Sequence, residues 1–250
     1  MTPEIDEAFE AIEAKHGAGS IDRVRDMLDP AKQQRHPQQR AAKWIMPGLS
    51  RKPWHDPYEH PEIAPVVRAF EAGHADIKRE LHEAWDRQAK AFSDYEHYLS
   101  SQSDWKALYL FRGGAQVTES ESLVPTAYKI LDEHVIQESK LCTLLESHFS
   151  TLLPGARVKP HCDLWNFSIN LHLAVDVPED CGIRVAGETR AWEEGKCLLF
   201  DYSFEHEAWN EGNRPRTCLL IDLWHPETTL AEREALTVLV TEIRELLGDV

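Results

Sequence analysis

Several features that mark particular protein classes are missing from this chain of 250 residues. It has five cysteines, an odd number, and none of them forms a CxxC pair, so neither a disulfide framework nor a zinc finger is expected. The apolar runs at Cys197–Phe200 and Cys218–Ile221 are far too short to cross a bilayer. No repeat with a period of about 34 residues is found.

Positive charge is also scarce. The formal net charge is −16, with 27 Lys and Arg against 43 Asp and Glu. Nonspecific binding to nucleic acid or to an anionic membrane needs a basic face, so we expect neither partner. Residues 1–17 are acidic and lack a basic segment followed by an apolar one, so we expect a cytoplasmic protein. The composition indicates no oligomeric state.

Helical patterns occur at both ends of the chain and in its first half. Apolar residues recur at helical spacing in residues 3–16, 21–28, 65–92, 122–138 and 230–247. Thr229 and Glu232 form the pattern of a capping box at the start of the last of these helices. We expect residues 1–43 to form a helical N-terminal extension and residues 44–250 to form the main domain with its supporting helices.

Short β-like segments dominate the second half of the chain. They are separated by turn signals such as Pro154-Gly155 and Gly212-Asn213, and they cover residues 105–111, 141–153, 157–161, 166–175, 182–186, 196–202 and 216–224. Strands at this spacing predict a mainly β protein, either a small barrel or a sandwich.

One of these segments alternates without a break between apolar and polar residues. Phe167, Ile169, Leu171 and Leu173 share one face, and the opposite face carries Asn166, Ser168, Asn170 and His172. The polar face includes a histidine and follows directly on His161-x-Asp163, so we favour a polar cavity over a wet outer surface. Arg216 begins segment 216–224, where its side chain can reach into the mouth of a barrel.

Two histidines and a carboxylate form the candidate metal site. His161 and Asp163 are two residues apart and face the same way on an extended backbone, and His206 is the candidate third ligand. This ligand set suits non-haem Fe(II) with open positions for a 2-oxo acid and O₂. Arg216 is then the candidate partner for the far carboxylate of 2-oxoglutarate. Zinc hydrolysis uses the same ligand types, but the chain has no HExxH pattern.

Several motifs of the sequence resemble those of a known family. Residues 181–227 contain ETRxWxEG, FDxSFEHEAWN and DxWHPE, and residues 47–57 read PGLSRKPWHDP. Together they closely resemble the aspartyl/asparaginyl β-hydroxylase family over about residues 44–235. The resemblance implies a double-stranded β-helix, a jelly-roll or cupin-like barrel, with an α-helical N-terminal lobe and a C-terminal helix. It also implies an Fe(II)/2-oxoglutarate dioxygenase.

The resemblance also assigns residues. It implies that His161 and His206 bind iron, that Arg216 and Ser150 hold the distal carboxylate of 2-oxoglutarate, and that His172 lies near its metal-side carboxylate. Many members have Gly where Asp163 stands, and the carboxylate here predicts a full triad.

The expected substrate residues depart from the family pattern. Asn170 and Ser168 stand where some relatives carry basic residues, so the resemblance does not extend to recognition of an acidic side chain. Trp165 and Trp209 flank the proposed ligands in sequence and are candidates for substrate contact, with packing as the alternative.

The expected activity is hydroxylation of an unactivated carbon, with the β-carbon of an Asp- or Asn-like amino acid or peptidyl residue as the leading candidate. The substrate is then a small molecule, a peptide or a carrier-bound amino acid. One alternative is desaturation, cyclisation or halogenation of a natural-product intermediate on the same scaffold. Another is a metal-containing barrel that binds a small molecule without turnover. Halogenation needs a free coordination position, so a liganding Asp163 argues against it.

Overall fold

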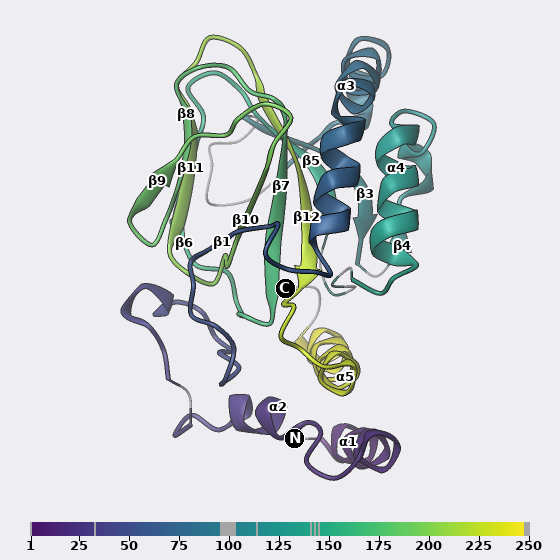
Figure 1. Ribbon diagram of the computed structural model, residues 1–250, viewed down its shortest axis with the longest axis vertical. Helices are drawn as coiled ribbons and strands as arrows, with labels where there is room; N and C mark the ends of the chain where they lie inside the picture. The colour runs from purple at the N-terminus through teal and green to yellow at the C-terminus, as the bar shows by residue number, and fades with distance from the viewer. Residues whose placement is uncertain are drawn as a thin grey trace.

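Two antiparallel β-sheets face each other and enclose the interior of the protein (Figure 1). The computed structural model describes residues 2–32, 34–95, 104–113, 115–140, 142, 144 and 146–247. The strands of the larger sheet, in spatial order, are β1 (Trp54–His55), β10 (Cys197–Phe200), β7 (Ser168–Asp176), β12 (Arg216–Trp224), β5 (Ser147–Leu152), β3 (Trp105–Arg112) and β2 (Ser93–Asp94), with β4 (Ala115–Gln116) paired to β3. Those of the smaller sheet are β6 (Arg157–His161), β11 (His206–Asn210), β8 (Cys181–Val185) and β9 (Glu188–Arg190).

The winding of the chain from β5 to β12 defines the fold. The chain passes back and forth between the sheets, with β5, β7, β10 and β12 in the larger one and β6, β8, β9 and β11 in the smaller one. The last strand, β12, lies between β7 and β5, while β11 lies between β6 and β8. This is a double-stranded β-helix, and it confirms the predicted fold class.

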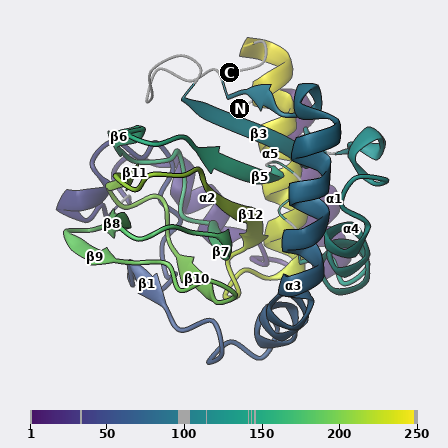
Figure 2. The same cartoon turned by 90° about the horizontal axis from the view of Figure 1, so that it is seen from above.

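Helix α3 (Ala64–Arg87) covers the outer face of the larger sheet, and α4 (Pro125–Leu131) packs beside it (Figure 2). The apolar stripe of α3, which includes Ile77 and Leu81, shares one core with Leu171 of β7. A Cβ placed on Gly73 would lie 2.7 Å from the side chain of Ile130, so the glycine allows α3 and α4 to approach closely.

A second core lies at one end of the barrel. Helices α1 (Pro3–His16), α2 (Asp22–Leu28) and α5 (Leu230–Leu247) bury Phe9, Val24 and Leu236 there. The predicted capping box of α5 is present, because the Thr229 hydroxyl accepts from Glu232 N–H at 3.2 Å and the Glu232 carboxylate accepts from Thr229 N–H at 2.8 Å. The division at residue 43 stays a prediction.

Some expected elements differ in extent. The helix expected over 65–92 ends at Arg87, and the one expected over 122–138 is α4 followed by a π-helical turn at Asp132–Ile136. Segment 141–153 contributes a strand only from Ser147, and residues 141, 143 and 145 lie outside the described part. The remaining short helical turns are 3₁₀ segments at Pro37–Gln39, Ala89–Ala91 and Thr118–Ser120. Across the described residues, every helix is too short or too polar to span a membrane.

Candidate metal centre

The three predicted ligands lie together at one edge of the smaller sheet. His161 ends β6, His206 begins β11, and the two are paired across the antiparallel ladder. Their ring centroids are 4.1 Å apart. The Asp163 Oδ2 atom lies 3.9 Å from His161 Nε2 and 3.5 Å from His206 Nε2. Within the described residues, this is the group of three that could hold a metal ion, with all ligand atoms within 4.8 Å of one another.

Backbone carbonyls fix which nitrogen of each ring is available. Nδ1 of His161 lies 2.8 Å from the carbonyl oxygen of Lys159, and Nδ1 of His206 lies 2.9 Å from that of Phe204. A carbonyl can only accept, so each Nδ1 carries the proton and donates it. In its neutral form each ring then has its Nε2 lone pair on the side of Asp163, which is the arrangement that metal-binding histidines use.

Desolvation keeps His206 neutral. Burial, and then the neighbouring His161, lowers the pKa of His206 to about 3. The ring therefore needs no deprotonation near neutral pH before it can coordinate a cation.

Asp163 is held differently from the two histidines. Strand β6 ends at His161, so strand alternation does not position the carboxylate as the sequence interpretation assumed. Its N–H instead donates to the carbonyl of Tyr202 at 3.0 Å. Desolvation, and then the charges of Asp222 and Asp201, raises the pKa of Asp163 to about 8, although the side chain keeps 42% exposure, which moderates the first effect. A bound divalent cation would offset this charge crowding.

The N-terminal segment braces the loop that precedes His206. The buried Gln39 amide donates to Ser203 Oγ at 2.8 Å, and Ser203 Oγ donates to Asp201 Oδ1 at 2.6 Å. Glu205 N–H also donates to the carbonyl of Gln38 at 2.6 Å. The strands expected from the sequence do not include FEHEAW, residues 204–209. From His206 onward this segment is the start of β11, which holds the His206 backbone in a ladder on both sides.

Arg216 is buried inside the barrel. Its residue is 3% exposed, and its guanidinium carbon lies 4.3 Å above the ring of Trp192. The His172 ring is parallel to Trp192, with centroids 6.2 Å apart. Desolvation, and then the charges of Arg216 and His206, lowers the pKa of His172. Among the described carboxylates none forms an ion pair with Arg216, and its Nε has no hydrogen-bond partner there.

Ser150 lies on the inward face of β5, opposite Cys218 of β12. Its hydroxyl accepts a hydrogen bond from the indole N–H of Trp105 at 2.8 Å. In the same ladder, Leu152 pairs with Arg216, so Ser150 is two positions along β5 from the partner of Arg216.

The polar face of β7 is buried, as the alternation predicted. Asn170 is 7% exposed, and its amide donates to Asp222 Oδ1 at 2.5 Å. Ser168 hydrogen-bonds the hydroxyl of Tyr202. These side chains therefore belong to the barrel interior and not to a wet outer surface.

The two tryptophans are not brought to the metal ligands. Trp165 is buried in the helical core against Phe167, and its indole N–H donates to Ser168 at 3.0 Å. Trp209 alternates with the inward Ala208 and lies over Gly182 on the outer side of the smaller sheet, where Arg157 stacks on it at 5.7 Å. Both positions correspond to the packing alternative.

The sequence did not lead us to place Trp192 and His148 in the interior. His148 could have been found from the alternation of the strand beside 216–224, and the alternation of 216–224 itself sets Asp222 on the face of Arg216. The turn containing Trp192 carries no such signal.

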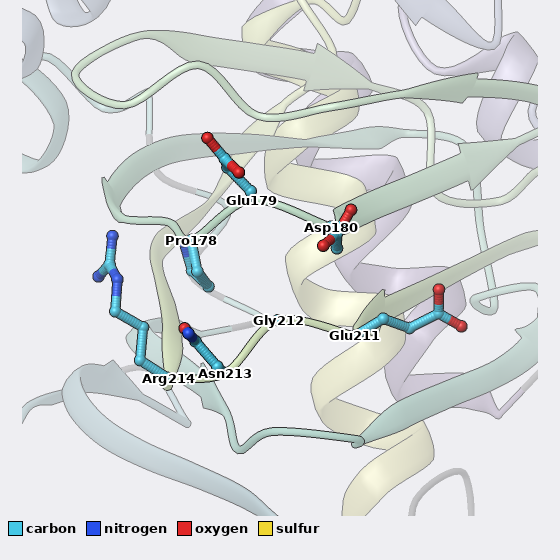
Figure 3. A pocket seen from close by; sticks show the side chains of 7 residues that line it. All are labelled: Pro178, Glu179, Asp180, Glu211, Gly212, Asn213 and Arg214. Carbon is cyan, nitrogen blue, oxygen red and sulfur yellow. The ribbon is translucent and has the colours of Figure 1, made fainter.

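A separate surface depression of about 410 Å³ lies between the turns at 178–180 and 211–214 (Figure 3). It is lined by charged side chains such as Glu179 and Arg214. It follows the end of β11 at Asn210, whereas His206 stands at the start of that strand, so it is not the candidate site.

Comparison with known proteins identifies the family. Residues 71–226 match the family described as aspartyl/asparaginyl beta-hydroxylase. The chain belongs to this family. It is 33% identical over 190 residues to the aspartyl/asparaginyl beta-hydroxylase of Mus musculus, covering 76% of this chain and 25% of that protein, and 32% identical over 190 residues to that of Homo sapiens, with the same coverage. The chain thus spans about a quarter of the length of these relatives.

A solved structure of the Trichoplax adhaerens prolyl hydroxylase, in complex with a hypoxia inducible factor oxygen degradation domain peptide fragment, is also similar. It is 12% identical, with a TM-score of 0.45, over 66% of this chain and 82% of that one. Membership of the family rests on the sequence matches alone.

Proposed function

We propose that this protein is an Fe(II)/2-oxoglutarate-dependent dioxygenase that hydroxylates the β-carbon of an Asp- or Asn-like amino acid or residue. The observation that carries the proposal is the convergence of His161, Asp163 and His206, whose ligand atoms lie within 4.8 Å of one another. The names of the family and of its relatives support the hydroxylase part.

The donor set fits Fe(II). Two imidazoles and one carboxylate, brought together where β6 ends and β11 begins, are the ligand types of a non-haem iron site, and they leave further positions for co-substrates. The hydrogen bonds of the two Nδ1 atoms fix the ring orientations, so the metal would meet preorganised ligands. When bound, Fe(II) together with 2-oxoglutarate and O₂ would supply the oxidising chemistry.

Arg216 fits the distal carboxylate of 2-oxoglutarate. A buried guanidinium without an ion-pair partner is costly, and a bidentate carboxylate would satisfy it. Trp192 fixes the plane of the guanidinium by stacking on it. His172 and Ser150 flank this position on β7 and β5, and we assign them to hold the co-substrate with Arg216.

An apolar ring borders the site. Phe200 packs against His206 at 5.8 Å and against His172 at 4.9 Å, so it forms an apolar wall beside both the metal ligands and the position assigned to 2-oxoglutarate. Such a wall strengthens the electrostatic contacts within the site and protects a reactive centre from side reactions.

The test is succinate formation from 2-oxoglutarate with Fe(II) and O₂, in the presence of capped or free aspartate and asparagine, with mass spectrometry of the amino acid. We expect Fe(II)-dependent succinate and a mass increase of one oxygen atom in the substrate. The variant Trp209→Phe, altered on the outer side of the smaller sheet, is the matched control and should keep this activity. Absence of Fe(II) and 2-oxoglutarate binding would refute the proposal.

A further inference from the structure

The inward face of the larger sheet carries a buried carboxylate that has no positively charged partner among the described residues. Asp222 is 9% exposed and accepts hydrogen bonds from the Asn170 amide at 2.5 Å and from Glu146 N–H at 3.2 Å. Both donors are neutral. Desolvation raises the pKa of Asp222 to about 7 despite these hydrogen bonds, so the carboxylate would gain from a nearby cation.

His148 lies on the same inward face, and its cross-strand partner Leu220 is two residues from Asp222. It sits on β5 between Tyr109 of β3 and Leu220 of β12, and it is 6% exposed. Among the described residues neither ring nitrogen has a hydrogen-bond partner, and Nδ1 is 3.8 Å from Glu146 Oε2. Desolvation, and then Arg112, lowers the pKa of His148 to about 3, so the ring is neutral and does not balance the acidic groups. A buried imidazole in this state calls for a polar ligand.

Aromatic rings complete the group. Tyr95 stacks on Trp105 at 4.2 Å, and the rings of Tyr95 and Tyr109 lie 5.5 and 5.3 Å from that of His148. The guanidinium of Arg112 already lies 4.3 Å above Tyr109, with its Nε 3.1 Å from Glu146 Oε1. One cation is therefore bound at the outer margin of this group by a ring and a carboxylate, the combination that recognises ammonium and guanidinium groups.

The charges at the proposed active site point the same way. Fe(II) and the dianion of 2-oxoglutarate cancel, and so do Arg216 and Asp163. Asp201 and Asp222 remain, and both accept their hydrogen bonds from neutral groups. An anionic substrate group here would add to an uncompensated negative charge, whereas a cationic group would neutralise it.

We propose that Asp222, Glu146, His148, Tyr95 and Tyr109 form a subsite, here called the acidic-aromatic subsite, that binds a positively charged nitrogen of the substrate. This inference rests on the proposed function. The nitrogen has two possible sources, the α-ammonium of a free amino acid and the side chain of a basic residue.

Calorimetric binding to protein loaded with Mn(II) and 2-oxoglutarate, without O₂, tests the subsite apart from turnover. One pair of probes is L-asparagine and N-acetyl-L-asparagine, which differ in the α-ammonium. The other is the acetyl amide of arginine and that of citrulline, which differ in the side-chain charge. We expect the charged member of one pair to bind at least tenfold more tightly, and that pair names the source.

Variants then show which residues cause the preference for the charged probe. Asp222→Asn should reduce this preference about tenfold, and Glu146→Gln gives an independent test if the first variant does not fold. Glu179→Gln, which removes the same charge at the distant depression of Figure 3, should leave the preference intact. Equal binding within both pairs, binding of no probe, or retention of the preference in both subsite variants would overturn the inference.

Binding of Fe(II) and 2-oxoglutarate to the same samples separates the two proposals. If both bind but no preference for a cation is seen, the subsite alone is wrong. If neither binds, the proposed function fails.

Discussion

The two faces of β7 are both buried, yet they differ completely in chemistry. Ile169, Leu171 and Leu173 point outward and pack under α3, while Asn170 and His172 point into the barrel among polar groups. Burial of an apolar side chain such as Leu171 contributes about 1.5–3 kcal/mol to folding. Burial of Asn170 or His172 does not contribute in this way, because their polar atoms must be satisfied. One strand thus separates a face that stabilises the fold from a face available for binding.

The strongest test of this division is removal of a ligand on the inner side. His206→Ala should lower Fe(II) affinity by more than about 100-fold, since even residues that only support a ligand are worth 10–100-fold. Turnover should fall to background, while the metal-free protein keeps its stability. Metal titration and denaturant unfolding would measure both, with the exposed His82→Ala as control. Retained Fe(II) affinity would remove His206 from the site.

The converse change is on the outer face. Leu171→Ala should lower the free energy of unfolding by about 3 kcal/mol, because it leaves a cavity under α3. Fe(II) affinity per folded molecule should not change. Urea unfolding and metal titration of the same sample test this, and a loss of metal affinity without loss of stability would show that the two faces are not separable.

Arg216→Ala should weaken 2-oxoglutarate binding by about 2 kcal/mol or more, roughly 30-fold, because a buried charge-assisted contact is lost. Fe(II) affinity should remain. Arg216→Lys should recover only part of the loss, since the ammonium cannot form the bidentate contact or stack on Trp192 in the same way. Unchanged 2-oxoglutarate affinity in Arg216→Ala would place the co-substrate elsewhere.

The pH dependence of stability should also arise from titrating residues of the polar interior. Desolvation lowers the pKa of five histidines: His55, His148, His172, His206 and His225. Below pH 6.5 the unfolded chain binds protons that these folded residues refuse, so acid favours unfolding. Asp163, with its pKa raised to about 8, and Asp201 and Asp222, with pKa raised to about 7, act in the opposite sense, because the folded chain then binds the extra protons.

The histidines outnumber these aspartates, so the metal-free protein should lose roughly 1–3 kcal/mol between pH 6.5 and 5.5. Leu171→Ala should shift the whole stability curve downward without changing its slope, because Leu171 carries no titrating group and packs among apolar side chains. Denaturant unfolding at several pH values measures both curves. A rise in stability toward pH 5.5 would contradict the expected balance.

The strand alternation of β7 and the capping box of α5 were predictable because they depend on local periodicity. The family motifs predicted the fold and the two histidines. Strand β11 was not predicted because FEHEAW is rich in polar residues, although the strand has a neighbour on each side. Only its pairing with β6 and β8 in the folded protein shows that the segment is a strand. Trp192 could not be placed because it lies outside any strand and reaches Arg216 only through the winding of the barrel.

Substitution of Asp163 should have the smallest effect on Fe(II) affinity, and it is the most informative test. Unlike His161 and His206, it lies outside the strands, and its side chain is 42% exposed. We therefore expect Asp163→Ala to lower Fe(II) affinity by about tenfold, less than His206→Ala, because two anchored imidazoles remain. Metal titration of Asp163→Ala and Asp163→Asn, with turnover of 2-oxoglutarate, tests this. Equal Fe(II) affinity in all three proteins would show that the carboxylate does not bind the metal, and the site would then consist of the two strand-borne histidines alone.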